Sequence, residues 1–376
     1  MASSSFDPTN VNLNTASMAD VVCYMNGDGN DYNGHLGARI SSVFVILFCS
    51  TAATLFPYVA RQLPRLKIPV HVYLFARYFG TGVILATAFV HLLDPAYSEI
   101  GPASCVGLTG NWALYSWPPA IVLTSVVCIF LLDFAAELYV ESKYGIGNSF
   151  ANGGGRPSFV QQHDHSSILP GADLNNGGNN NKDAADAATG PKPETTLKNW
   201  DTYSSDLDSE SAERSFKQQI AAFIILEFGI MVHSVVIGLN LGVAGDEFST
   251  LYPVLVFHQS FEGLGIGARM SAIPFKKGSW LPYLFGAVYG LTTPISIAIG
   301  IGLRTTYNPN SNTANIVSGI LDSISAGILT YTALVELLAR DFLFDPCRTN
   351  DRRRLAFMVI CTVLGAGIMA LLGKWA

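Results

Sequence analysis

Two stretches of the chain place imidazole and carboxylate groups inside long apolar runs. His258 and Glu262 lie four residues apart in the run 249–272, so on a helix their side chains share one face. His233 lies in a second apolar run, 218–243. Zn²⁺ takes imidazole nitrogen and carboxylate oxygen, commonly from four ligands. Ionisable groups at membrane depth are costly, and we therefore interpret these three residues as a metal site inside a membrane.

The sequence around one histidine repeats around the other. The pattern H-x-x-x-x-G-L-x-x-G begins at His233 and begins again at His258. Its glycines are spaced four residues apart, which gives each helix a narrow face for close packing. The corresponding glycines are Gly238 with Gly263, and Gly242 with Gly267. We predict a pair of membrane helices whose histidines face each other.

The composition is that of an integral membrane protein. Of 376 residues, 49% are hydrophobic and only 13% are charged, which is unlike a soluble domain. Eight apolar runs are long enough to cross a lipid bilayer as helices, so the predicted fold class is all-α with eight transmembrane helices. The net charge of −6 sits mostly in one central polar segment and gives no indication of a nucleic-acid partner. The runs are 38–60, 70–93, 113–140, 218–243, 249–272, 279–303, 313–339 and 353–373.

The placement of lysine and arginine predicts the orientation. Eighteen of the 22 basic residues lie in the connections after the first, third, fifth and seventh runs, and such connections face the cytoplasm. Both termini are therefore expected outside the cell. Cys23 and Cys105 are then the only cysteine pair on the oxidising side. A disulfide between them and two separate thiols are both compatible with the sequence.

This topology divides the chain into five parts. The tail lacks the apolar core of a cleavable signal peptide, so the first span is expected to direct insertion. The central loop is rich in Asn, Gly, Ser and Asp and is expected to be disordered, with His163 and His165 in a plain flexible linker. The parts are an extracellular tail 1–37, transmembrane helices 1–3 in 38–140, a cytoplasmic loop 141–216, central helices 4–5 in 217–272, and helices 6–8 in 273–376.

A second internal match joins two other spans. The segments TAFVHLL, 87–93, and TALVELL, 332–338, are identical at five of seven positions, although their helices are expected to run in opposite directions. Together with the central pair, this match predicts a 3+2+3 inverted repeat with its site near the midplane, as in transporters. It places His91 and Glu336 at equivalent depths on opposite sides. We expect His91 to receive metal from outside and to visit the site, and Glu336 either to pass metal to the cytoplasm or simply to pair with Arg340.

These features resemble the ZIP (Zrt/Irt-like) family of divalent-metal transporters, and most closely its plasma-membrane zinc-uptake members of fungal type. The resemblance covers the eight spans, the exterior termini, the long loop, and the segments HSVVIG from His233 and HQSFEG from His258. It implies that the central helices carry the transport site. The expected function is import of Zn²⁺ into the cytoplasm by alternating access, with Fe²⁺, Mn²⁺ and Cd²⁺ left open. A homodimer is compatible with the sequence, which does not decide the oligomeric state.

Some members of the resembled family hold two adjacent metals, and this chain lacks the necessary acids. A ligand position in the fourth span is occupied by Ile237, and the bridging acid of the fifth span is replaced by Gln259. Ser234 is a poor substitute for a charged ligand. Glu262 is the one remaining carboxylate of this cluster, and one carboxylate cannot offset the repulsion between two divalent ions. We therefore predict a single metal in the site, with Ser234 and Gln259 as neutral neighbours.

The alternative from another class is an intramembrane enzyme, dependent on metal or haem, that uses the facing histidines. A zinc hydrolase needs a positioned base, and the sequence contains no H-E-x-x-H motif. Haem ligation would give Glu262 and the inverted repeat no purpose. A structural polar cluster is a third reading. No organic cofactor and no use of ATP are expected, because no nucleotide-binding motif is present.

Overall fold

The computed structural model describes residues 9–12, 16–25, 32–63, 69–144, 194–276, 278–344, 349 and 351–375. Side chains are described for all of these except 140–144 and 194–215. The chain divides into two units, residues 1–138 with 216–376, and residues 139–215. The first unit carries the site.

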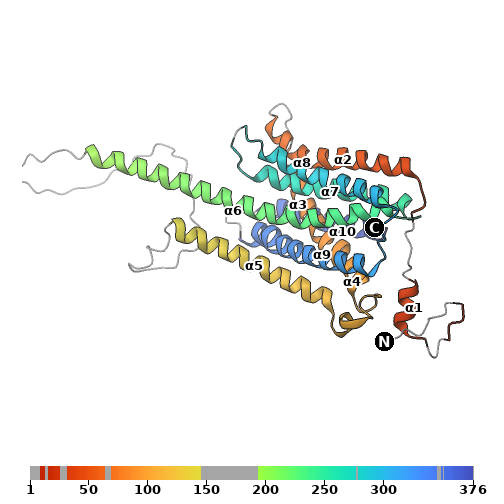
Figure 1. Cartoon of the computed structure of the whole chain (residues 1–376). Helices are drawn as coiled ribbons and strands as arrows, with labels where there is room; N and C mark the ends of the chain where they lie inside the picture. The colour runs from red at the N-terminus through yellow and green to blue at the C-terminus, as the bar shows by residue number, and fades with distance from the viewer. Residues whose placement is uncertain are drawn as a thin grey trace, which may run out of the picture. The chain divides into compact units, whose positions relative to one another are not determined.

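The described residues form helices and no strand, which confirms the predicted fold class (Figure 1). Seven helical segments are long and apolar enough to cross a membrane. The further long helix, α7, has 25 residues and carries His258, Gln259 and Glu262, whose polarity lowers its hydropathy. The bounds are α1 Met18–Met25, α2 Leu36–Gln62, α3 Val70–Ala86, η1 Thr87–Leu93, α4 Asp94–Ile100, η2 Gly110–Leu114, α5 Trp117–Tyr144, α6 Glu194–Val243, α7 Phe248–Ala272, α8 Leu281–Leu303, α9 Asn312–Tyr331, η4 Thr332–Phe344 and α10 Arg352–Leu372.

The predicted disordered loop 141–216 lies mostly outside the described residues, and this includes His163 and His165. Its last part is different from the expectation, because α6 begins at Glu194 and is helical from there to the membrane segment. The stretch 194–215 contains neither glycine nor proline, the two residues that most disfavour a helix interior. Helix is therefore compatible with its local sequence despite its polarity.

The two halves of the internal repeat share an unusual backbone. TAFVHLL forms the π-helix η1 between α3 and α4, and TALVELL begins the π-helix η4 that continues from α9. Short π-helical stretches are rare and occur frequently at functional sites. The same departure from α-helix at the same place in both segments agrees with the inverted repeat predicted from their identity.

The glycines of the central helices pack as the repeat requires. A Cβ atom at Gly242 of α6 would clash with Gly300 of α8, and one at Gly267 of α7 would clash with Thr54 of α2. Helices α2 and α8 are the first spans of the two halves, so each central helix uses its equivalent glycine face against an equivalent partner. Figure 1 shows α2, α7 and α8 running side by side. This packing sets the depth of the histidines on α6 and α7.

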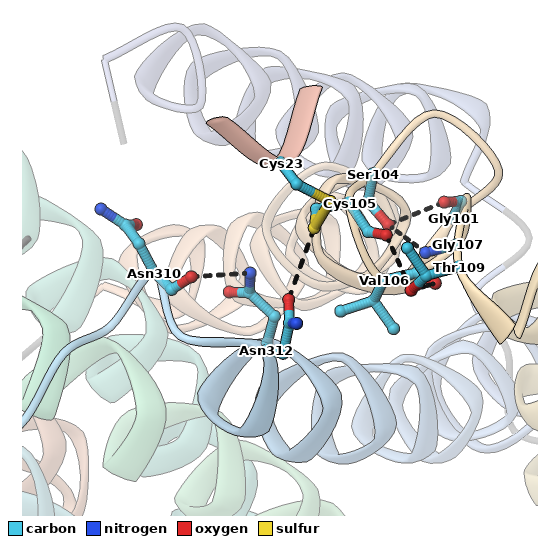
Figure 2. Close-up of a disulfide and its surroundings, with 10 residues drawn as sticks. Cys23, Gly101, Ser104, Cys105, Val106, Gly107, Thr109, Asn310 and Asn312 are labelled. Atoms are coloured by element: carbon cyan, nitrogen blue, oxygen red, sulfur yellow. Dashed lines mark hydrogen bonds between the residues drawn. A yellow bond between two sulfur atoms is a disulfide. The ribbon is translucent and has the colours of Figure 1, made fainter. Parts of the chain in front are cut away.

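The loop that follows α4 is tied to the N-terminal segment. Cys23 of α1 and Cys105 form a disulfide (Figure 2), which selects one of the two states that the sequence left open. Within the loop, the Ser104 hydroxyl donates to the Gly101 carbonyl and accepts from the Gly107 amide. These contacts fix the turn of the loop, and Asn312 Oδ1, at the start of α9, lies 3.5 Å from the Cys105 sulfur.

Candidate metal site

Three side chains from the two central helices converge inside the membrane unit. The ligand atoms of His233, His258 and Glu262 lie within 4.8 Å of one another. His258 Nε2 lies 3.3 Å from Glu262 Oε1, and the two imidazole rings have centroids 5.5 Å apart. Donor atoms of a tetrahedral zinc site are about 3.3 Å apart, given zinc–ligand distances near 2.0 Å. The three groups thus need only small movements to hold one ion.

The burial of these groups is energetically costly if they serve only as a structural polar cluster. His233 is 3% exposed, and His258 and Glu262 are fully buried. Across the described part of the chain, neither ring nitrogen of either histidine has a hydrogen-bond partner, and the same holds for Glu262 Oε2. An unsatisfied buried polar group costs about 1–3 kcal/mol, and most such groups in native proteins are paired. A divalent cation bound to these atoms would remove that cost.

Thr87 orients the carboxylate of the site. Its hydroxyl, at the start of η1, donates to Glu262 Oε1 at 2.9 Å. This contact fixes one oxygen and leaves Oε2 available as a ligand, as outer hydrogen bonds commonly do at metal sites. Sequence analysis did not single out Thr87, although it is the first residue of the repeated TAFVHLL segment.

His91 lies next to the three ligands. Its ring centroid is 4.6 Å from that of His258, and the residue is 4% exposed. Its Nε2 lies 3.1 Å from the carbonyl oxygen of Met369 in α10. A carbonyl can only accept, so the imidazole donates from Nε2 and Nδ1 is left as an acceptor or metal ligand. This arrangement suits the predicted visiting ligand.

Ser234 and Gln259 fill the neighbouring position as a neutral pair. Both are fully buried, and Gln259 Nε2 lies 3.3 Å from Ser234 Oγ, to which it donates. The Tyr289 hydroxyl also donates to the backbone carbonyl of Gln259 at 2.8 Å. Ile237 packs with an apolar cluster on the same side of the molecule. Gln259 and Ser234 therefore add no charge beside Glu262.

Glu336 does not join the three ligands. It lies in η4, is 8% exposed, and pairs with Arg340 at 2.6 Å. It also lines a pocket of about 450 Å³ together with Arg77, Arg269 and Asp341. Glu336 thus pairs with Arg340, one of the two roles that the sequence left open, and it also lies beside a polar cavity.

Asp322 of α9 is a neighbour that sequence analysis did not assign to the site. Its Oδ1 lies 3.9 Å from His233 Nδ1, and its side chain is 5% exposed. The available signal was a carboxylate in the middle of an apolar run. That signal did not identify the partner, because the contact depends on how α9 packs against α6.

Comparisons with known proteins show which sequences this chain is similar to. A family model described as ZIP Zinc transporter matches residues 36–373. Zinc-regulated transporter 1 of Saccharomyces cerevisiae is 54% identical, over 99% of this chain and 97% of the relative. Zinc-regulated transporter 1 of Schizosaccharomyces pombe is 41% identical, over 96% and 90%, and zinc transporter 9 of Oryza sativa is 33% identical, over 96% and 95%. No solved structure matches the chain.

Proposed function

The chain belongs to the ZIP family of zinc transporters, and we propose that Zn²⁺ crosses the membrane by binding to His233, His258 and Glu262. As a member of this family it is a zinc importer rather than an enzyme, and the hypothesis of a metal- or haem-dependent enzyme has no support. The observation that carries the proposed site is the convergence of three buried side chains from α6 and α7, in which the imidazole nitrogens and Glu262 Oε2 have no hydrogen-bond partner among the described residues.

The ligand set suits an ion that must be both bound and released. Three protein ligands leave the fourth tetrahedral position open for water or for another side chain. His91 is placed to occupy that position while the ion arrives, because its ring contacts His258 and its Nδ1 is an acceptor. An incomplete shell allows exchange more readily than a closed set of four protein ligands.

The charge of the site favours one ion at a time. Two divalent ions about 4 Å apart repel each other by about 16 kcal/mol at an effective dielectric constant of about 20. Glu262 is the one carboxylate among the three ligands and cannot offset this alone, and Gln259 and Ser234, which share a neutral hydrogen bond, add no negative charge. We therefore assign one Zn²⁺ to the space between α6 and α7.

We also propose that the ion moves from the side of His91 to the side of Glu336 by alternating access. The inverted repeat supports this, because the two residues occupy equivalent places in η1 and η4. On the inner side, the pocket lined by Glu336 offers a polar exit. Near it, Arg77 of α3 and Arg269 of α7 both contact Asp341 of η4, at 2.7 and 3.5 Å. Opening toward the cytoplasm must rearrange these contacts.

The protein is a multi-pass membrane protein, and we propose that it lies in the plasma membrane with both termini outside the cell. The distribution of lysine and arginine supports this orientation. The Cys23–Cys105 disulfide supports it independently, because both cysteines fall on the proposed outer side and disulfides persist in oxidising compartments. The loop 141–216 would then be cytoplasmic.

Zinc uptake into proteoliposomes tests the proposed site. We expect labelled zinc to enter vesicles containing the wild-type protein and to enter His258→Ala vesicles no faster than protein-free ones. His71→Ala serves as the matched control. His71 is exposed on α3, and the one ring contact described for it is with Phe357. Normal transport by His258→Ala at equal protein content would refute the site assignment.

A further inference from the structure

Two acidic residues outside the three-ligand site lie on helices α4 and α9, which pack against each other. Glu99 is the penultimate residue of α4, and Asp322 lies midway along α9. The helices approach closely, because a Cβ atom at Gly319 of α9 would clash with the side chain of Ile100. The transport site as described above uses neither acid.

Both carboxyl groups have buried oxygen atoms without partners. Asp322 Oδ1 makes no hydrogen bond to any described residue, since its 3.9 Å distance from His233 Nδ1 is too long for one. Glu99 Oε2 is likewise buried and unpaired among the described groups, and Glu99 lies within electrostatic range of Asp322. Two neighbouring carboxylates with unsatisfied buried oxygens are unfavourable by desolvation and by repulsion. A cation relieves both costs at once.

The pair connects the outer loops with the transport site. On one side, Tyr307 lies in the connection between α8 and α9, and its pKa is raised by burial and further by the charge of Glu99. The Tyr307 hydroxyl also lies 3.5 Å from Asn240 Oδ1, near the end of α6. On the other side, Asp322 faces His233. Polar groups thus follow one another from the loop to the first imidazole.

We propose that Glu99 and Asp322 form an entry subsite for a hydrated divalent cation, from which the ion passes to His233. The subsite rests on the proposed function, because it supplies the transport site. Two carboxylates bind divalent ions through oxygen and without strong preference among them. Selection for a borderline metal such as zinc then falls to the imidazole-rich site beyond. The subsite raises the local concentration of divalent ions, and the site formed by His233, His258 and Glu262 selects among them.

Concentration-dependent zinc uptake by Glu99→Gln, Asp322→Asn and the double variant tests this subsite. Each single variant should raise the KM for zinc about tenfold while changing the maximal rate less than about twofold. The KM of the double variant should be little higher than that of either single variant, because both residues bind the same ion. Glu247→Gln is the matched control, since Glu247 is an exposed acid at the connection between α6 and α7. Asp322→Glu, which keeps the charge, should stay close to wild type.

Two results would overturn the proposal. One is a KM for both variants equal to that of Glu247→Gln. The other is a lowered maximal rate for Asp322→Asn with no effect of Glu99→Gln, which would make Asp322 a residue that only positions His233. If the wild type moves no zinc, zinc titration of the purified protein tests the subsite independently of transport. We then expect a weaker binding class that His258→Ala retains and Asp322→Asn loses, and its absence from the wild type contradicts the subsite.

Discussion

At the scale of single residues, the site combines metal ligands that the sequence predicts with neighbouring residues that it does not. His233, His258 and Glu262 stand out because polar groups are expensive inside apolar helices. Thr87 and Asp322 also lie beside these donors, at 2.9 Å from Glu262 Oε1 and 3.9 Å from His233 Nδ1 respectively. Their roles depend on contacts between helices far apart in the sequence, which the spacing along one chain does not encode.

Removing the Thr87 hydroxyl should weaken zinc binding without removing a ligand. Thr87→Ala is expected to raise the KM for zinc about tenfold, because a hydrogen bond to a charged group contributes about 1.5 kcal/mol or more. Thr87→Ser keeps the donor and should transport nearly as well as wild type. Uptake kinetics of the two variants, at matched protein content, measure the difference. Equal KM values for both would show that Glu262 needs no such support.

At the scale of elements, the apolar runs predicted an all-helical membrane fold but did not reveal the local backbone of the helices. The predicted run 353–373 compares with α10 Arg352–Leu372, and 249–272 with α7 Phe248–Ala272. The identity of TAFVHLL and TALVELL predicted that two segments are equivalent. It did not predict that both are π-helical, because a hydrogen-bond register depends on tertiary packing rather than on apolar periodicity.

The glycine faces of the central helices provide a test of this packing. Gly267→Ala should destabilise the protein by about 1–3 kcal/mol, because the added Cβ has no room against the backbone of Thr54. Gly367→Ala in α10 is the control, since a Cβ there meets nothing within 4 Å. Thermal unfolding in detergent should show a lower midpoint for the first variant alone. Equal midpoints would mean that α2 and α7 lie farther apart than described.

At the scale of the whole molecule, the predicted inverted repeat would relate the two halves of the proposed transport path. The sequence predicted this symmetry from two short matches and an orientation derived from charge. The packing of α6 on α8 and of α7 on α2 agrees with it. The sequence did not decide between a disulfide and two thiols for Cys23 and Cys105, because pairing depends on the distance between distant parts of the chain.

Thiol labelling tests both the disulfide and the orientation. In intact cells, a membrane-impermeant maleimide should label Cys23 and Cys105 only after reduction, since the two are joined and are proposed to lie on the outer side. Cys128, an exposed residue within α5 that faces the bilayer region, should stay unlabelled and serves as a control. Mass spectrometry of the labelled peptides identifies the sites. Labelling of both cysteines without reduction would contradict the disulfide, and labelling only after permeabilisation would reverse the proposed topology.

The central claim is that one zinc ion binds between α6 and α7 at His233, His258 and Glu262. Anomalous scattering at the zinc edge, from crystals of the zinc-loaded protein, locates the ion directly. We predict a single strong peak between these helices, within about 2.0–2.2 Å of imidazole nitrogen and carboxylate oxygen. The absence of a peak there, or two well-occupied peaks between α6 and α7, would contradict the claim.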